Sequence, residues 1–208
     1  MIGIVDYGVG NLYSLTCSLR QVGEEAVVTR EEAVLRGADR IILPGVGAFE
    51  DARERLQSLR LDELLQSLAG LGKPLLGICL GMQLLFERSF EYGEHRGLGL
   101  IRGEIRSLRP VLSADAKVPH MGWNSLLFSP KEISLLKGVQ AGDFVYYVHS
   151  YYAADCEEAL VAWSEHGGVS VPGVVQWKNV LGTQFHPEKS GEVGLRILAN
   201  FGREVATC

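Results

Sequence analysis

The 208-residue sequence predicts an α/β fold, an open and mostly parallel sheet with helices on both faces and an antiparallel extension. Two observations support this prediction. In the first half, short apolar runs alternate with segments whose apolar residues recur at helical spacing, which is typical of a parallel sheet covered on both faces. In the second half, strand-like runs follow one another with little helix between them, which indicates antiparallel pairing. The length fits a single domain spanning residues 1–208.

Four short strands are expected in the first half of the chain, because each is a brief and largely apolar run. They are Ile2–Val5, Ala26–Thr29, Arg40–Leu43 and Leu75–Ile78. Helices are expected where apolar residues recur at intervals of three and four. These helices are Asn11–Val22, followed by Gly23 as a typical C-terminal stop, then Phe49–Ala69 and Leu80–Arg88.

The second half is expected to consist mainly of strands. The predicted strands are Ile101–Leu108, Asn124–Phe128, Phe144–His149 and Leu160–Ser164. Asn179 is a typical turn residue, so Val174–Lys178 and Val180–Phe185 are predicted to form a hairpin. A final helix is predicted over Glu192–Val205, because Ile197, Phe201 and Val205 recur at every fourth position.

Composition and charge exclude several classes of function. The net charge of −5 and the pI of about 5.6 give no indication of a nucleic acid or an anionic membrane as partner. No apolar run approaches membrane-spanning length, and the N-terminus lacks the basic and apolar regions of a signal peptide. The four cysteines are scattered without a Cys-x-x-Cys pair, so neither a metal site nor a cofactor is expected. A reduced, cytoplasmic protein is the simplest interpretation.

The most informative stretch is Gly77-Ile78-Cys79-Leu80-Gly81, where a predicted strand meets a predicted helix. Glycines two residues to either side of a cysteine match the sharp turn that exposes a nucleophile at the carboxyl edge of a sheet. Small residues are needed there because the turn brings them close to neighbouring backbone. The helix N-terminus favours the thiolate, and the Leu80 amide points to where an oxyanion develops. The alternative is a buried structural cysteine.

A nucleophilic cysteine needs a base, and His186 is the candidate among the five histidines. If the chain stays extended through Pro187, His186 and Glu188 project to the same side. The carboxylate would then fix the imidazole tautomer while the other ring nitrogen faces the thiol. His-x-Glu alone is a weak signal, and the alternative is a strand-end histidine beside a solvated glutamate. His149 is the next candidate for the base.

Two glycine-containing loops follow predicted strands. In Pro44-Gly45-Val46-Gly47, the glycines free the backbone, so the Val46 amide is a candidate for the second oxyanion donor. A plain βα loop is the alternative. The Gly-x-Gly of Asp6–Asn11 is not a dinucleotide site, because Tyr13 stands where the third glycine belongs and no acidic partner completes the pattern.

With these residues in hand, the chain resembles the class I, triad-type glutamine amidotransferases, which have a flavodoxin-like sheet. Cys79, His186 and Glu188 match the Cys-His-Glu triad of that family in order and spacing. Further segments are similar to the glutaminase subunits of imidazole glycerol phosphate synthases. These segments are Asp6–Leu12, Pro44–Gly47, Val118–Asn124, Tyr147–Tyr151 and His186–Ser190.

The resemblance implies an enzyme of histidine biosynthesis that hydrolyses glutamine through a thioester on Cys79. Residues similar in position to those that hold the amino-acid end of glutamine are Gln83, Ser150 and Tyr151. The ammonia would pass to a separate (β/α)₈ cyclase subunit, in a heterodimer that makes imidazole glycerol phosphate and aminoimidazole carboxamide ribotide. Residues at or near that interface would be Asn11, Trp123, Tyr146 and Lys189. From sequence alone, each of these residues also has an ordinary structural interpretation. Asn11 could be a helix cap, Trp123 a core anchor, Tyr146 one of several strand aromatics and Lys189 a solvated charge.

Three competing interpretations stay open at this point. The chain could be a glutaminase subunit that feeds another synthase, such as one making pyridoxal phosphate, anthranilate or a purine precursor. It could be a non-catalytic scaffold that retains the fold, although the intact triad argues against this. A cysteine peptidase on a related fold is a weaker third option.

Overall fold

The computed structural model describes residues 1–203, and in that part of the chain the main feature is an eight-stranded sheet. Its strand order is β2-β1-β3-β4-β14-β13-β12-β9. The parallel part comprises β1 (Ile2–Val5), β2 (Ala26–Thr29), β3 (Arg40–Leu43), β4 (Leu75–Ile78) and β14 (Val180–Thr183). The antiparallel extension comprises β13 (Val169–Trp177), β12 (Leu160–His166) and β9 (Leu127–Phe128). The predicted fold class is confirmed.

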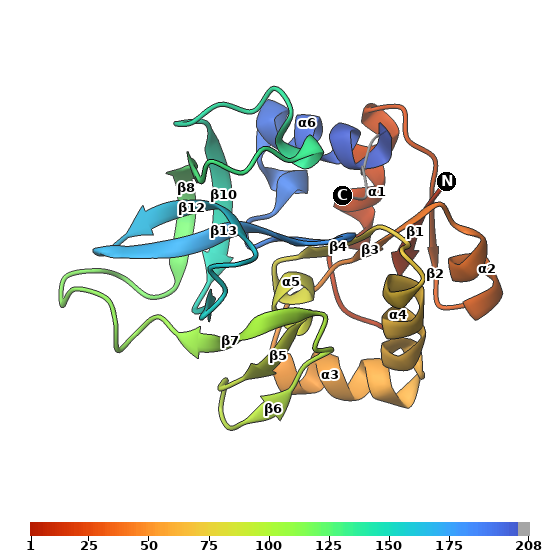
Figure 1. The fold of residues 1–208 in the computed structure, drawn as a ribbon, viewed down its shortest axis with the longest axis horizontal. Coiled ribbons are helices and arrows are strands. Elements are labelled where there is room, and N and C mark those ends of the chain that lie inside the picture. Colours follow the sequence, from red (N-terminus) through yellow and green to blue (C-terminus); the bar gives the residue numbers. More distant parts are fainter. Residues whose placement is uncertain (204–208) are drawn as a thin grey trace.

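Helices cover both faces of this sheet (Figure 1). One face is covered by α1 (Leu12–Gln21) and α6 (Gly191–Arg203), which pack against each other. The other face carries α2 (Glu32–Gly37), α3 (Phe49–Ser58), α4 (Leu61–Gly70) and α5 (Leu80–Leu84). Successive strand residues alternate between the two cores: Ile41 and Leu43 pack on one side, and Ile42 on the other. Burial on both faces explains why these strands are continuously apolar.

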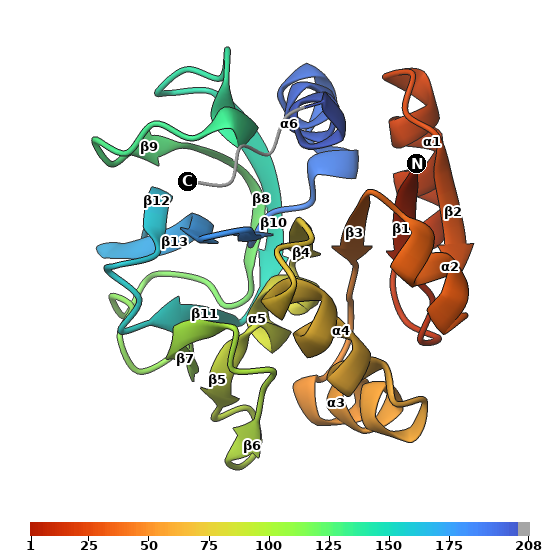
Figure 2. The ribbon, with the colours of Figure 1, turned by 45° about the vertical axis from the view of Figure 1, so that its right-hand side comes forward.

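Two smaller sheets complete the structure. The β8–β10 ribbon pairs β8 (His120–Ser125) with β10 (Phe144–His149), and α6 lies between this ribbon and α1 (Figure 2). A four-stranded sheet lies beside α5 in the order β11 (Tyr151–Ala154), β7 (Ile101–Ser107), β5 (Phe86–Ser89) and β6 (His95–Arg96). Short 3₁₀ helices are η1 (Ser134–Leu136) and η2 (Pro187–Lys189).

Two predicted helices were too long. The segment Phe49–Ala69 forms two helices, because Arg60 takes a left-handed backbone conformation (φ 56°) and ends the first of them. The corner is bridged by Arg53, whose guanidinium donates to the Asp62 carboxylate at 2.8 Å. The helix predicted over Leu80–Arg88 ends at Leu84, because the following residues pair with β7 as strand β5.

Other boundaries shift by smaller amounts. The strand predicted over Asn124–Phe128 is split: β8 begins earlier, at His120, and ends at Ser125, and β9 holds only Leu127–Phe128. The hairpin turn at Asn179 is present, with Lys178 in the left-handed region (φ 53°). Elements α2, β5, β6 and β11 were not predicted. Val205, the last member of the helical pattern, lies outside the described residues, as does Cys208.

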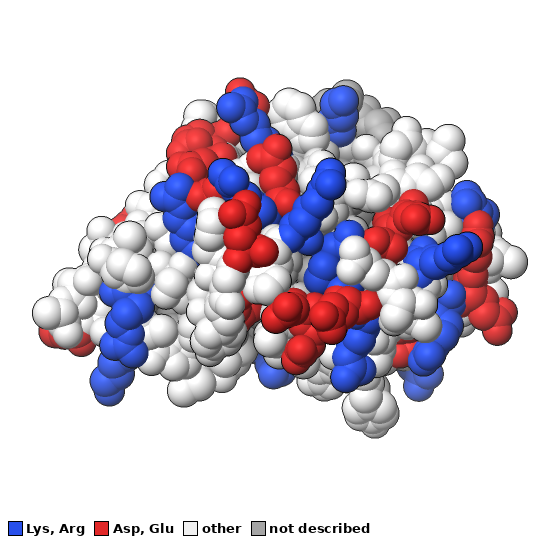
Figure 3. Space-filling view, turned by 90° about the horizontal axis from the view of Figure 1, so that it is seen from below, with Lys and Arg blue, Asp and Glu red and all other residues white. Residues whose placement is uncertain are grey.

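The charged side chains do not gather by sign on the face seen in Figure 3, where Lys and Arg alternate with Asp and Glu. Within residues 1–203, every helix is too short or too polar to cross a membrane.

Candidate active site

Cys79 stands on the turn between β4 and α5, at the carboxyl end of the parallel strands. Its backbone has φ 55° and ψ −111°, a strained conformation for a residue with a Cβ. The flanking glycines are sterically required. A Cβ on Gly81 would overlap the Leu43 carbonyl oxygen, and one on Gly77 would lie 2.6 Å from the Gly81 carbonyl oxygen. The strand-to-helix turn predicted from the sequence is present, with the close backbone approaches that exclude larger residues.

His186 and Glu188 form a buried ion pair beside this turn, with 2.8 Å between Nδ1 and Oε1. Their side chains are 2% and 4% exposed. The chain is not extended here as predicted, because residues 187–189 form η2, and this 3₁₀ turn brings the carboxylate to the ring. Burial opposes the charge on His186, but the Cys79 sulfur and the Glu188 carboxylate raise its pKa to about 9. At neutral pH the imidazole therefore holds a proton, and its positive charge lies beside the Cys79 sulfur.

A cavity of about 450 Å³ opens in front of Cys79 and His186. It brings together most of the predicted site residues from distant parts of the chain. Its lining consists of Val46, Gly47, Cys79, Leu80, Gln83, Glu91, Pro119, Val148, His149, Ser150, Tyr151 and His186. Glu188 does not line the cavity and lies behind His186, where it can orient the imidazole but cannot contact a ligand.

The Pro44–Gly47 loop packs directly on the cysteine turn. A Cβ on Gly45 would lie 2.7 Å from the Gly81 amide nitrogen, so only glycine permits this approach. Tyr7, which the sequence analysis did not select, fixes the loop by donating from its buried hydroxyl to the Pro44 carbonyl at 2.7 Å. Burial raises the pKa of Tyr7, so this donor stays protonated. Val46 and Leu80 thereby lie on the same cavity.

The cavity lining includes the polar residues Gln83 and Glu91. The Gln83 side-chain nitrogen donates to the Tyr151 carbonyl and to Gln184 Oε1, each at 3.0 Å, so only its own Oε1 is left for a ligand. Glu91 was not predicted as a site residue, because the helix predicted through Arg88 gave no indication that strand β5 and a loop at the cavity follow α5. Glu91 Oε2 accepts from the Phe49 amide at 2.7 Å, and burial raises the pKa of this carboxyl.

His149 lines the cavity but does not have a free ring nitrogen. Its Nδ1 donates to the Tyr151 carbonyl at 2.8 Å, and its Nε2 lies 3.0 Å from His120 Nδ1. Burial is the main cause that lowers the pKa of His149 to about 3, and electrostatic repulsion from His120 is the second. By contrast, His186 Nε2 is buried and has no hydrogen-bond partner among the described residues. The geometry therefore favours His186 as the base.

Three of the predicted interface residues form a cluster on the surface. The Trp123 and Tyr146 rings meet edge to face with 6.0 Å between centroids, and Lys189 Nζ lies 6.0 Å from the Tyr146 ring centre. Trp123 is 55% exposed and is not a core anchor. Asn11 caps α1, where its side-chain oxygen accepts from the Ser14 amide at 3.3 Å.

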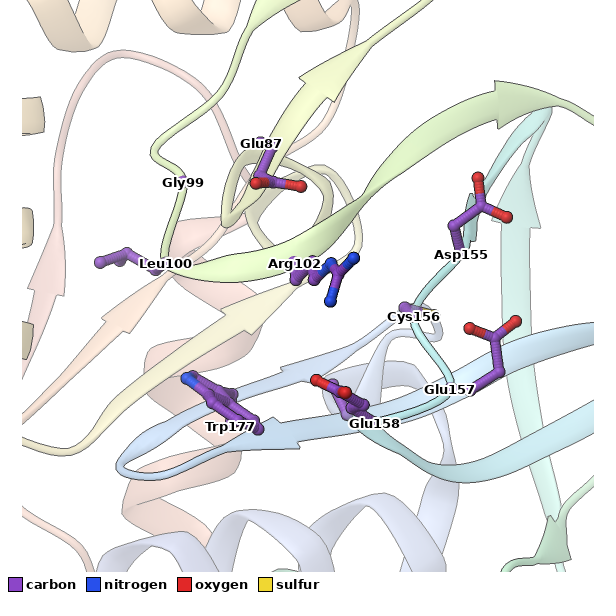
Figure 4. Close-up of a pocket in the computed structure, with 10 residues that line it drawn as sticks. Glu87, Gly99, Leu100, Arg102, Asp155, Cys156, Glu157, Glu158 and Trp177 are labelled. Atoms are coloured by element: carbon purple, nitrogen blue, oxygen red, sulfur yellow. The ribbon is translucent and has the colours of Figure 1, made fainter.

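A second hollow of about 460 Å³ lies away from Cys79, between the start of β7, the turn after β11 and the end of β13 (Figure 4). Its charged lining is Glu87, Arg102, Asp155, Glu157 and Glu158. Burial, reinforced by Glu157 and Asp155, raises the pKa of Cys156 in this hollow to about 12, so this thiol is not a nucleophile at neutral pH. Among residues 1–203, no group of three His, Cys, Asp or Glu side chains is placed to hold a metal ion.

Comparison with known proteins identifies the class to which this site belongs. Residues 3–205 match the family described as Glutamine amidotransferase class-I, and the chain belongs to that family. A crystal structure of a glutamine amidotransferase superposes with a TM-score of 0.73 at 19% identity, covering 97% of this chain and 98% of that one. The structure of PurLQS from Thermotoga maritima gives a TM-score of 0.71 at 19% identity, covering 96% of each chain.

Relatives with higher sequence identity belong to one particular group within this family. Imidazole glycerol phosphate synthase subunit HisH from Bacillus cereus (strain ATCC 14579) is 51% identical over 201 residues, which cover 97% of this chain and 93% of the relative. The protein of the same name from Bacillus thuringiensis (strain Al Hakam) is 49% identical over 207 residues, covering 100% and 96%. The family resemblance drawn from the sequence is thereby confirmed.

Proposed function

We propose that this chain is the glutaminase subunit of an imidazole glycerol phosphate synthase, an enzyme of histidine biosynthesis in the cytoplasm. It hydrolyses glutamine to glutamate and ammonia. The observation that carries the proposal is the strained Cys79 turn beside the buried His186–Glu188 pair, at one end of a cavity of amino-acid size. The identity of about half to synthase subunits over the whole chain supports the assignment. We also propose that residues 1–208 act as one domain around the eight-stranded sheet.

The hydrolysis proceeds in two steps at Cys79. The thiolate attacks the side-chain amide carbon of glutamine, and His186 gives its proton to the departing ammonia as the carbon–nitrogen bond breaks. A water molecule then attacks the thioester, His186 takes its proton, and the carbon–sulfur bond breaks to release glutamate. The 2.8 Å contact with Glu188 holds the ring orientation through both steps.

The oxyanion of each tetrahedral intermediate is held by the backbone amides of Leu80 and Val46. Leu80 is the first residue of α5, directly after the nucleophile, and Val46 lies on the Tyr7-fixed loop that packs against the same turn. Each donor of this kind contributes about 10²–10³ in rate. Gly45 is packed against the Cys79 turn, but Gly47 is open, since an added Cβ there would meet no atom within 4 Å, and Val46 is 41% exposed, so the second donor is the part of the site most open to control.

The amino-acid end of glutamine binds among the polar residues that line the cavity with Cys79 and His186. Its ammonium group faces the Glu91 carboxylate, a half-buried group that already uses one oxygen to accept from the Phe49 amide. Gln83 offers its remaining amide oxygen, and Ser150 and Tyr151 also line this cavity. A partly desolvated carboxylate suits a cationic ligand group, because the pairing offsets the desolvation of both charges.

The ammonia passes to a separate cyclase subunit with a (β/α)₈ barrel, which completes a heterodimer. The β8–β10 ribbon presents an apolar outer face for such a partner. Met121, Trp123 and Phe144 are each more than half exposed on it, and Trp123 is the cross-strand neighbour of Tyr146. Large exposed aromatic residues are typical of interface anchors. Lys189 lies beside Tyr146 on this face, and we assign Asn11, at the start of α1, to the same interface.

The test is a glutamate-release assay on the free chain, on the complex with the cyclase subunit, and on that complex with its acceptor ligand. We expect the free chain to be slower than the liganded complex by at least about 10², because an unaligned Val46 amide removes one oxyanion donor. Equal rates in the free chain and the liganded complex would identify a standalone glutaminase. A chain without glutamine turnover in any state would identify a scaffold.

A further inference from the structure

A buried amide lies directly behind the catalytic sulfur. Gln184 follows β14 and is fully buried, and its side-chain nitrogen lies 3.8 Å from Cys79 Sγ, within the range of an N–H···S hydrogen bond. The sulfur also lies 3.9 Å from the Val148 carbonyl oxygen, which can accept only from a protonated thiol. The surroundings of the sulfur thus provide an acceptor for the thiol, the Val148 carbonyl, and a donor for the thiolate, the Gln184 amide.

The orientation of the Gln184 amide is determined by its neighbours. The Tyr151 carbonyl can only accept, so the Gln83 atom 3.0 Å away must be the side-chain nitrogen. That nitrogen also lies 3.0 Å from Gln184, so the Gln184 atom facing it must be the oxygen. The other end of the Gln184 amide, the N–H₂ group, therefore points to the sulfur. A reversed Gln184 amide would place two donors against each other at Gln83.

The Tyr151 carbonyl is itself held from the opposite side. His149 Nδ1–H donates to it at 2.8 Å, which leaves His149 Nε2 to accept from His120 Nδ1–H at 3.0 Å. His120 Nε2 then accepts from the Asn124 side-chain amide at 3.2 Å. Burial lowers the pKa values of both histidines, so each ring is neutral and carries one N–H. All the donors and acceptors along this buried chain match.

We infer that Gln184 acts in the proposed glutaminase reaction by donating a hydrogen bond to the Cys79 thiolate, and that Gln83 holds the Gln184 amide in the required orientation through the Tyr151 carbonyl. The inference rests on the proposed function only in taking Cys79 as the nucleophile. Gln184 contacts the reacting atom, whereas Gln83, His149 and His120 are positioning residues. Gln83 then has two tasks, because it lines the cavity and also sets the amide behind the sulfur.

The test is the rate of Cys79 alkylation by iodoacetamide between about pH 5 and pH 10, the range that spans ordinary thiol ionisation. Peptide-resolved mass spectrometry separates Cys79 from the other cysteines. The variants are Gln184→Met and Gln83→Met, which keep side-chain length but remove the donor or its orienting partner. The matched control is Gln176→Met on β13. The side-chain nitrogen of Gln176 donates to the carbonyl of Lys178, two residues further along the chain.

Losing a hydrogen bond to a charged group lowers the thiolate fraction about tenfold at low pH. The freed thiolate is about threefold more nucleophilic, because nucleophilicity rises with basicity. We therefore expect Gln184→Met to react about threefold slower than the unchanged chain near pH 5 and about threefold faster near pH 10. Gln83→Met should show the same crossover with a smaller amplitude. His186 and Tyr7 are the titratable groups beside the sulfur, and both are present in every variant. Their titration therefore affects the variant and the unchanged chain alike and cancels in the ratio of the two alkylation rates.

A ratio of variant to unchanged rate that stays constant from pH 5 to pH 10 for both variants would overturn the inference, whatever its value, since altered access alone does not depend on thiol ionisation. If Gln184→Met does not fold, the Gln83→Met profile decides the question by the same criterion. Alkylation needs neither glutamine nor the cyclase. A rate ratio that does not change with pH, in a chain with intact glutaminase activity, would therefore refute only the role of Gln184. Absent glutaminase activity in the unchanged chain would refute the proposed function instead.

Discussion

Replacing Gly81 with alanine tests whether the nucleophile turn is fixed by steric contact. The added Cβ would overlap the Leu43 carbonyl oxygen and lie 2.8 Å from the Leu43 carbonyl carbon. Both atoms belong to backbone at the end of a buried central strand, so no flexible side chain can move aside. Either β3 or the Cys79 turn must shift, and the two are linked through the Pro44–Gly47 loop that carries the proposed second oxyanion donor.

The size of the effect follows from that overlap. Restoring an ordinary contact requires a displacement of about 1.5 Å, and a misplacement of about 1 Å already lowers the rate of an oriented reaction about 10²-fold. Overpacking against rigid backbone lowers the free energy of unfolding by about 3 kcal/mol. For a chain of this length, that corresponds to a fall in Tm of about 6–12 °C.

The matched control is Gly70→Ala at the end of α4, where an added Cβ would meet no atom within 4 Å. We expect this variant to retain its activity and to be as stable as the unchanged chain or slightly more stable, because alanine is the better helix residue. The assays are glutamate release by the complex, ammonia-dependent synthesis by the same complex, and thermal unfolding. Gly81→Ala should lose the first activity and keep the second at temperatures below its Tm.

Full glutamate release by Gly81→Ala would refute the steric argument, since the sulfur and the oxyanion donors would then tolerate the shift. An equal loss of ammonia-dependent synthesis would show instead that the substitution disrupts the assembly and not the turn.

Four further predictions concern the residues around the cavity. Cys79→Ser should abolish glutamine hydrolysis but leave ammonia-dependent synthesis intact. His186→Ala should slow single-turnover thioester formation more than Glu188→Ala does, because proton transfer matters more than orientation. Glu91→Gln should raise the KM for glutamine with little change in kcat, as expected for uniform ground-state binding measured by steady-state kinetics. Although burial opposes the charge, the Cys79 sulfur and the Glu188 carboxylate raise the pKa of His186 to about 9 in the folded chain, so the charged imidazole stabilises the fold fully below about pH 6.5 and loses this contribution, part of which comes from Glu188, as the pH rises through about 9. The difference in Tm between the unchanged chain and Glu188→Gln should therefore shrink over that interval.

Each of these predictions has a contradicting result. Glutamine turnover by Cys79→Ser would move the nucleophile elsewhere, and near-normal thioester formation by His186→Ala would do the same for the base. A fall in kcat at unchanged KM would place Glu91 in the chemistry and not in substrate binding. A Tm difference for Glu188→Gln that grows with pH would mean that His186 is neutral in the folded chain.

Local sequence patterns were sufficient for the sheet and for the catalytic turn. The runs Ile2–Val5, Arg40–Leu43 and Leu75–Ile78 became central strands with the predicted bounds, because a strand buried on both faces lacks polar side chains wherever it is covered; the only charged member, Arg40, stands at the partly exposed start of β3. The Gly77–Gly81 pattern located the Cys79 turn, since backbone sterics act between residues that are close in sequence. The end of α3 at Arg60 had no such signal, as arginine is ordinarily a good helix residue.

Contacts between distant segments required the tertiary structure. Cys79 and His186 meet because β4 and β14 are parallel neighbours, with the Cys79 amide donating to the Thr183 carbonyl at 2.7 Å. The loop after β5 places Glu91 in the cavity. The sequence by itself determined which chemical groups are available and how the backbone turns beside them. Which atoms face one another was decided by the fold, because a side-chain hydrogen bond such as that from Gln184 to the sulfur depends on partners from several strands at once.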